Sequence, residues 1–118
     1  RRAMMLCGSF SHNGWTGFGK TTKMHCHGIE HTLSGRHPEI AHGEGLRFLL
    51  AEFIKVNYDL LKDKIAKFGK FVFDENDPSM VYNRLEKYFS TLPLRHSMRE
   101  CGISESEENE LLLRLKLN

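Results

Sequence analysis

Histidine is the residue type whose spacing in this sequence points most directly to chemistry. Five of the seven histidines lie between residues 25 and 42. His27 and His31 are four residues apart, so on a helix they share one face. His42 follows a loop and stands at the start of the next predicted helix. Imidazole nitrogens bind iron, zinc, copper and nickel, so these three residues predict a metal site, with a chance cluster of surface histidines as the alternative.

The segment His42-Gly-Glu-Gly45 opens that next helix with two glycines. Glycine allows close approach of the backbone, and the free N–H groups of a helix start can face a ligand. A histidine in this setting is positioned by the backbone, which suits a metal ligand. The alternative is that Gly43 and Gly45 serve a tight contact between two helices.

The other candidates for chemistry are weaker. His25 lies two residues from His27, so we expect it to point off the shared face and to be exposed, and His37 lies in a loop that can flank a cavity mouth. His12 and His96 have no partners nearby in sequence. The Cys26–His27 adjacency is not the ligand spacing of a tetrahedral zinc site. The glycines of residues 14–19 complete neither a dinucleotide-binding nor a P-loop motif.

Apolar residues at steps of three and four predict the helices that must position these side chains. The expected ranges are 3–13, 22–34, 42–58, 59–73, 78–91 and 104–118. Thr21 or Thr22 is the expected cap of the second helix and Gly35 its stop. Asp77 before Pro78, and a capping box from Ser104 to Glu107, mark two further helix starts.

The helix predicted over 59–73 should place five apolar residues inward: Leu60, Leu61, Ile65, Phe68 and Phe71. The helix predicted over 78–91 should do the same with Met80, Val81, Leu85, Tyr88 and Phe89. The only β-like run is Lys70–Phe73. The expected fold is therefore all-α, a bundle of about five or six helices.

Composition narrows the class of protein. The chain has 118 residues, 40 % of them apolar, and a formal charge of +2 that is scattered along the sequence, so it reads as one domain without a nucleic-acid partner. No apolar run approaches the roughly 18 residues that span a bilayer, so no membrane segment is expected. Three widely spaced cysteines form no disulfide framework, which favours a reducing, cytoplasmic setting.

The stretch from His27 to Leu46 resembles the second signature of the iron-containing (group III) alcohol dehydrogenases, with His-x3-His, a small-residue turn, a loop and His-Gly at a helix start. Segments resembling other parts of that family occur in the same order along the chain, residues 11–14 upstream of this stretch and residues 56–58, 92–94 and 100–103 downstream of it. The helix sequence His-x-Ile-Glu-His is most similar to the butanol-dehydrogenase-like branch. Glu44 departs from the small residue of many members and changes the expected local charge.

The resemblance implies the C-terminal helical domain of an NAD(P)-dependent enzyme that interconverts alcohols and aldehydes or ketones by metal-assisted hydride transfer. The family holds Fe²⁺, or alternatively Zn²⁺, by one Asp and three His, of which two match His27 and His42. His31 matches a catalytic position beside the nicotinamide and the small alcohol or aldehyde substrate. The other two ligands and the NAD(P)-binding domain are expected upstream of residue 1, and the full-length enzyme is expected to be a homodimer.

Residues 1–118 are thus predicted to be a single helical metal-binding domain, a fragment that lacks the N-terminal NAD(P)-binding domain and is inactive alone. A different class of function remains open. The chain can be a free-standing helical interaction or metal-sensing module without catalysis, in which the three histidines and Cys26 hold Zn²⁺. A truncated remnant that merely folds is the third interpretation.

Overall fold

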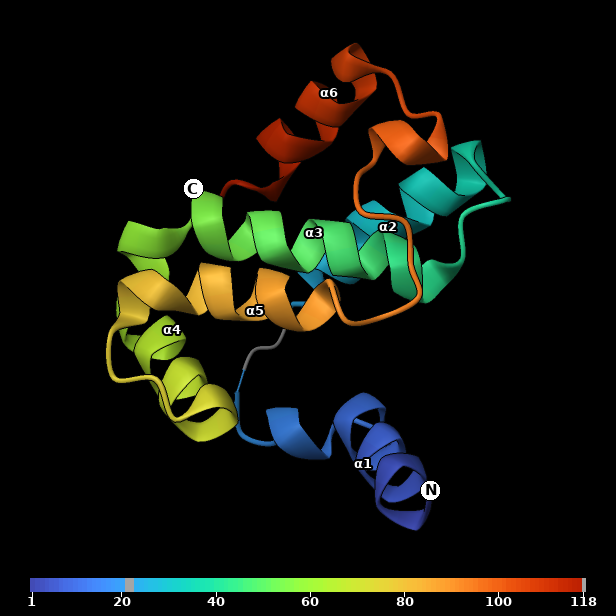
Figure 1. Cartoon of the computed structure of the whole chain (residues 1–118). Helices are drawn as coiled ribbons and strands as arrows, with labels where there is room; N and C mark the ends of the chain where they lie inside the picture. Colours follow the sequence, from blue (N-terminus) through green and yellow to red (C-terminus); the bar gives the residue numbers. More distant parts are fainter. Residues whose placement is uncertain (21–22, 118) are drawn as a thin grey trace.

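The structure is a computed structural model that describes residues 1–20 and 23–117. In this part of the chain all regular structure is helical (Figure 1), with α-helices α1 (Arg2–His12), α2 (His25–Arg36), α3 (His42–Val56), α4 (Tyr58–Phe73), α5 (Val81–Phe89) and α6 (Glu105–Leu115), and short 3-10 helices η1 (Trp15–Gly17), η2 (Pro78–Met80) and η3 (Arg99–Cys101). The all-α prediction is confirmed. The β-like run Lys70–Phe73 is the last turn of α4.

Helix α3 is the centre of the fold and packs against α2, α4, α5 and α6 (Figure 1). Its amphipathic surface contributes to two apolar clusters. The first cluster lies between α2, α3 and α6 and contains Ile29, Leu33, Ile40, Phe48, Leu49, Met98, Cys101, Ile103, Leu111 and Leu115. The second lies between α3, α4 and α5 and contains Ala51, Ile54, Ile65, Val81 and Leu85. Burial of these side chains is the main source of stability.

The helix starts predicted at Asp77 and Ser104 are both present, but each differs from the prediction in one respect. The Ser104 hydroxyl accepts a hydrogen bond from the Glu107 N–H at 3.3 Å, but the Glu107 side chain contacts His37 instead of closing the capping box. Asp77 accepts from the Ser79 N–H at 2.9 Å, with Pro78 next to it. The first turn there is the 3-10 helix η2, and α5 follows.

The bounds of α2 differ from the prediction. The proposed caps Thr21 and Thr22 lie outside the described residues, and α2 begins at His25. Gly35 does not stop the helix, which ends one residue later at Arg36. Arg36 is held there by Glu110 of α6, at 3.1 and 3.2 Å, and Pro38 then prevents continuation.

The predicted inward face of α4 is partly wrong. Leu60 is 62 % exposed and Phe71 is 86 % exposed, whereas Ile65 is buried. At 100° per residue both lie more than about 110° around the helix from Ile65. Gly69 sets the true contact stripe, because a Cβ atom there would collide with the Val81 side chain. In the predicted helix 78–91, which forms η2 and α5, Met80 and Tyr88 are also exposed instead of inward. Val81 and Leu85 form its buried face.

Helix α1 forms as predicted, but its apolar stripe does not join the core. None of its residues is buried, and Met4, Met5 and Phe10 are exposed. It packs mainly on η1, where the Phe10 and Trp15 rings meet edge to face at 5.7 Å between centroids.

Asn57 fills the corner between α3 and α4. Its buried side-chain amide donates to the carbonyl groups of Phe53 and Leu115, each at 2.9 Å. Its side-chain oxygen accepts from the Leu117 N–H at 2.7 Å. One side chain thus joins this corner to the end of α6.

An ion pair between His37 and Glu107 closes α2 against α6, with 2.9 Å between Nε2 and Oε2. Glu107 raises the pKa of His37, and His37 lowers the pKa of Glu107. The His37 contribution to stability is present below its unfolded pKa of 6.5 and is lost as pH rises through the raised folded value. The Glu107 contribution is present above 4.5 and is lost as pH falls through the lowered folded value.

The pair is therefore strongest between those two unfolded pKa values. We expect His37→Gln to lower the free energy of unfolding by about 1 kcal/mol at pH 5.5 and by much less at pH 8.5. Urea unfolding at the two pH values measures this, with the exposed His96→Gln variant as control. An equal loss at both pH values would contradict the ion pair.

Candidate metal centre

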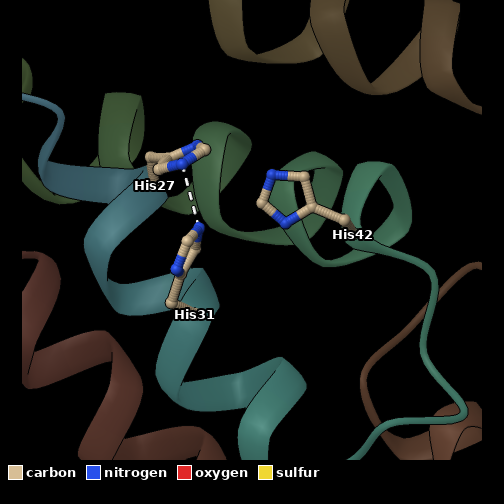
Figure 2. A group of neighbouring side chains, drawn as sticks. All are labelled: His27, His31 and His42. Atoms are coloured by element: carbon tan, nitrogen blue, oxygen red, sulfur yellow. Dashed lines mark hydrogen bonds between the residues drawn. The ribbon is translucent and has the colours of Figure 1, made fainter.

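The three histidines singled out by their spacing converge between α2 and α3. Nε2 of His31 lies 2.9 Å from Nε2 of His27, one turn earlier on α2. The His42 ring centroid is 4.9 Å from that of His27 and 5.5 Å from that of His31. Each residue offers a nitrogen, and the three nitrogens all lie within 4.8 Å of one another. Figure 2 shows His42 reaching from the start of α3 toward the two rings on α2.

The loop between the two helices places His42. After Pro38 the chain turns back, and Ile40 enters the first apolar cluster. Ala41 is extended and its carbonyl accepts hydrogen bonds from the N–H groups of Glu44 and Gly45, at 2.9 and 3.0 Å. His42 is therefore fixed in the first turn of α3, beside the helix that carries His27.

Glu30, which the sequence analysis did not single out, contacts the histidine cluster from the protein interior. Its side chain is 0 % exposed, its carboxylate pairs with His42 Nδ1, and the Ser34 hydroxyl donates to its other oxygen. Gly45 makes room for it, because a Cβ atom there would lie 2.8 Å from Glu30 Oε1. The packing interpretation therefore holds for Gly45, whereas Gly43 faces open space.

These residues fit a divalent metal. With Nδ1 of His42 bound to the Glu30 carboxylate, its Nε2 keeps the lone pair that a metal needs. Desolvation lowers the pKa of His27, and the neighbouring His31, His42 and His12 lower it further. Neutral imidazole, the form that binds metals, is thus favoured at His27.

Two of the weaker candidates have structural roles. His25 is half-buried, not exposed as predicted, because its Nε2 lies 2.9 Å from the Arg114 carbonyl of α6 and its ring packs near Phe53. Cys26 packs on the first apolar cluster, and burial raises its pKa to about 11. The thiol does not belong to the histidine cluster found among the described residues.

The other residues singled out by the sequence analysis are His12, His96 and Glu44. The His12 ring centroid is 5.7 Å from that of His27, a proximity that sequence spacing did not indicate. His96 is exposed; its backbone carbonyl accepts a hydrogen bond from the Arg47 side chain, and its backbone N–H donates to the Glu100 carboxylate. Glu44 is buried and pairs with Arg95 at 2.7 Å, so its charge is neutralised locally.

An open, mostly apolar cavity of about 620 Å³ adjoins His27. Its lining includes His12 and Gly43, together with Leu46, Leu50 and Phe53 of α3. The cluster thus borders a space that can receive a small organic molecule.

The fold and the site define an all-helical domain with three convergent histidines. The chain belongs to the Fe-containing alcohol dehydrogenase family, whose C-terminal profile matches residues 1–115. It is 30 % identical over 117 residues to the NADH-dependent butanol dehydrogenase A of Clostridium acetobutylicum, a match that covers 91 % of this chain. The matched part is 29 % of the length of that relative. No solved structure matches the chain. Among the described residues, no helix is both long and apolar enough to cross a membrane.

Proposed function

We propose that this chain is the C-terminal metal-binding domain of an NAD(P)-dependent alcohol dehydrogenase that interconverts small alcohols and aldehydes or ketones. The convergence of His27, His31 and His42 on one point, in a chain of this family, carries the proposal. The relative that resembles it is named for NADH and butanol, which favours a short aliphatic substrate. The apolar cavity beside His27 suits the carbon chain of such a substrate.

His27 and His42 would hold the metal, Fe²⁺ in the first place and Zn²⁺ as the alternative. A bound divalent ion supplies Lewis acidity to the oxygen of the alcohol or aldehyde. Glu30 orients His42 through Nδ1. In the assembled enzyme His31 would hydrogen-bond the substrate or move its proton, because its ring is exposed and adjacent to that of His27.

The test is reduction of butanal with NADH or NADPH in two preparations, the 118-residue chain alone and the chain joined to an NAD(P)-binding domain of this family. We expect no turnover by the chain alone, even with Fe²⁺ or Zn²⁺, since the chain holds no nucleotide-binding motif. The joined protein should show metal-dependent turnover that His27→Ala abolishes and His96→Ala preserves.

Robust turnover by the isolated chain would contradict the proposal. So would a joined protein that folds and binds NADH but shows no turnover dependent on metal and His27. Far-UV circular dichroism and NADH fluorescence establish folding and nucleotide binding before activity is compared.

A free-standing interaction module is the second candidate, favoured by the exposed apolar side chains of α1 and the segment after it. These are Met4, Met5, Leu6, Phe10, Trp15 and Phe18. The half-buried Cys26 thiol does not support the zinc-sensing version that includes it, because its raised pKa disfavours the thiolate that binds zinc. Metal-dependent turnover by the joined protein decides against this candidate.

A further inference from the structure

We propose that His31 is a third metal ligand, so that the 118-residue chain binds a divalent cation through His27, His31 and His42 without ligands from elsewhere. The inference rests on the metal role proposed above for His27 and His42, and adds His31 to it. It changes the expectation that this chain carries only half of a metal site.

The distance between the two histidines on α2 is the first argument. Two nitrogens bound to one ion at about 2.1 Å lie roughly 3.0–3.4 Å apart. Nε2 of His31 and Nε2 of His27 are 2.9 Å apart, so a small rotation of either ring brings both to this spacing. The hydrogen bond between them holds one proton on Nε2 of the donor ring, and a cation can occupy this position once that ring carries its proton on Nδ1 instead.

The third imidazole is fixed from a different helix. His42 offers its nitrogen within 4.8 Å of the other two, and the His31 and His42 rings are perpendicular to within about 12°, with 78° between their planes. The Glu30 carboxyl group contacts Nδ1 of the His42 ring and so holds the ring in place. The site is thus formed by His27 and His31 on one turn of α2 and by His42 at the start of α3, on the opposite side of the cation position.

The exposure of the three residues indicates an open site. His31 and His42 are exposed and His27 is half-buried, so a cation enters from solvent and keeps positions for water. Three protein nitrogens with open positions is the ligand set of catalytic zinc sites. In the assembled enzyme, upstream ligands can replace His31 and release it toward the substrate.

The test is a titration of the metal-free 118-residue chain with Zn²⁺ in competition with a chromogenic chelator. We expect one ion per chain, and an affinity lower by on the order of 100-fold in each of His27→Ala, His31→Ala and His42→Ala. His96→Ala, at an exposed residue outside the cluster, and His12→Ala, whose ring approaches that of His27, should stay within about twofold of the parent. The visible spectrum of bound Co²⁺ should change in His31→Ala.

Far-UV circular dichroism shows that each variant keeps its helices. If His31→Ala binds as tightly as the parent while His27→Ala does not, His31 is not a ligand and the proposed function stands. If no substitution in the cluster weakens binding, the cluster is not a metal site and both proposals fail. A loss in His12→Ala equal to that in His31→Ala would overturn the three-histidine composition.

Discussion

Replacing Glu30 by glutamine is expected to weaken Zn²⁺ binding by the chain by about 10- to 100-fold, the usual effect of removing the group that orients a ligating histidine. Glu30 is fully buried and its carboxylate pairs with His42 Nδ1. Glutamine keeps the volume but presents an uncharged amide, so the tautomer and orientation of His42 are less firmly set. The chelator competition described above measures the loss.

The matched control is Glu110→Gln, because Glu110 is also a helical glutamate but its half-exposed side chain pairs with Arg36, away from the site. Its zinc affinity should equal that of the parent. Gly45→Ala approaches the same carboxylate from α3 and should lower the affinity too, since the new Cβ atom would lie 2.8 Å from Glu30 Oε1. Unchanged affinity in both Glu30→Gln and Gly45→Ala would show that Glu30 does not position His42.

Replacing Leu33 by alanine is expected to lower the free energy of unfolding by about 2–5 kcal/mol, the range for large-to-small changes in a core. Leu33 is 0 % exposed and lies in the first apolar cluster, on the same helix as His27 and His31. The lost methyl groups leave a cavity between α2, α3 and α6 that these helices cannot fully close. Urea unfolding followed by circular dichroism gives the value.

The exposed Leu113 of α6 provides the control for this prediction. It is 77 % exposed, so Leu113→Ala should change stability by less than about 0.5 kcal/mol. A loss below 1 kcal/mol for Leu33→Ala, or equal losses for both variants, would mean that the cluster between α2 and α6 is not the core described above.

The helices could be predicted from local sequence, but their contacts could not. Apolar steps of three and four residues, the Asp77 cap and the Ser104 cap are local signals, and all have counterparts in the structure. Which side of α4 faces inward depends on α5, because Gly69 admits the Val81 side chain. Leu60 and Phe71 were therefore assigned to the wrong side by a pattern that contains no information about the partner helix.

The same division applies to the site. The four-residue spacing of His27 and His31 and the helix start at His42 were sufficient to indicate that the three can meet. Glu30 lies between the two α2 histidines in sequence but turns to the buried side, where only the docking of α3 reveals its partner. The approach of His12 depends on how α1 lies relative to α2, which no local pattern encodes.

The hydrogen bonds of Asn57 have a consequence for how the protein unfolds. Its buried amide links the corner of α3 and α4 to the last turn of α6, and these helices belong to different apolar clusters. Fraying of α6 from its end must break hydrogen bonds that also hold this corner, and the freed amide would remain in an apolar place. The two clusters, which α3 already joins, are thus also linked through this one side chain, and loss of the end of α6 is expected to weaken both.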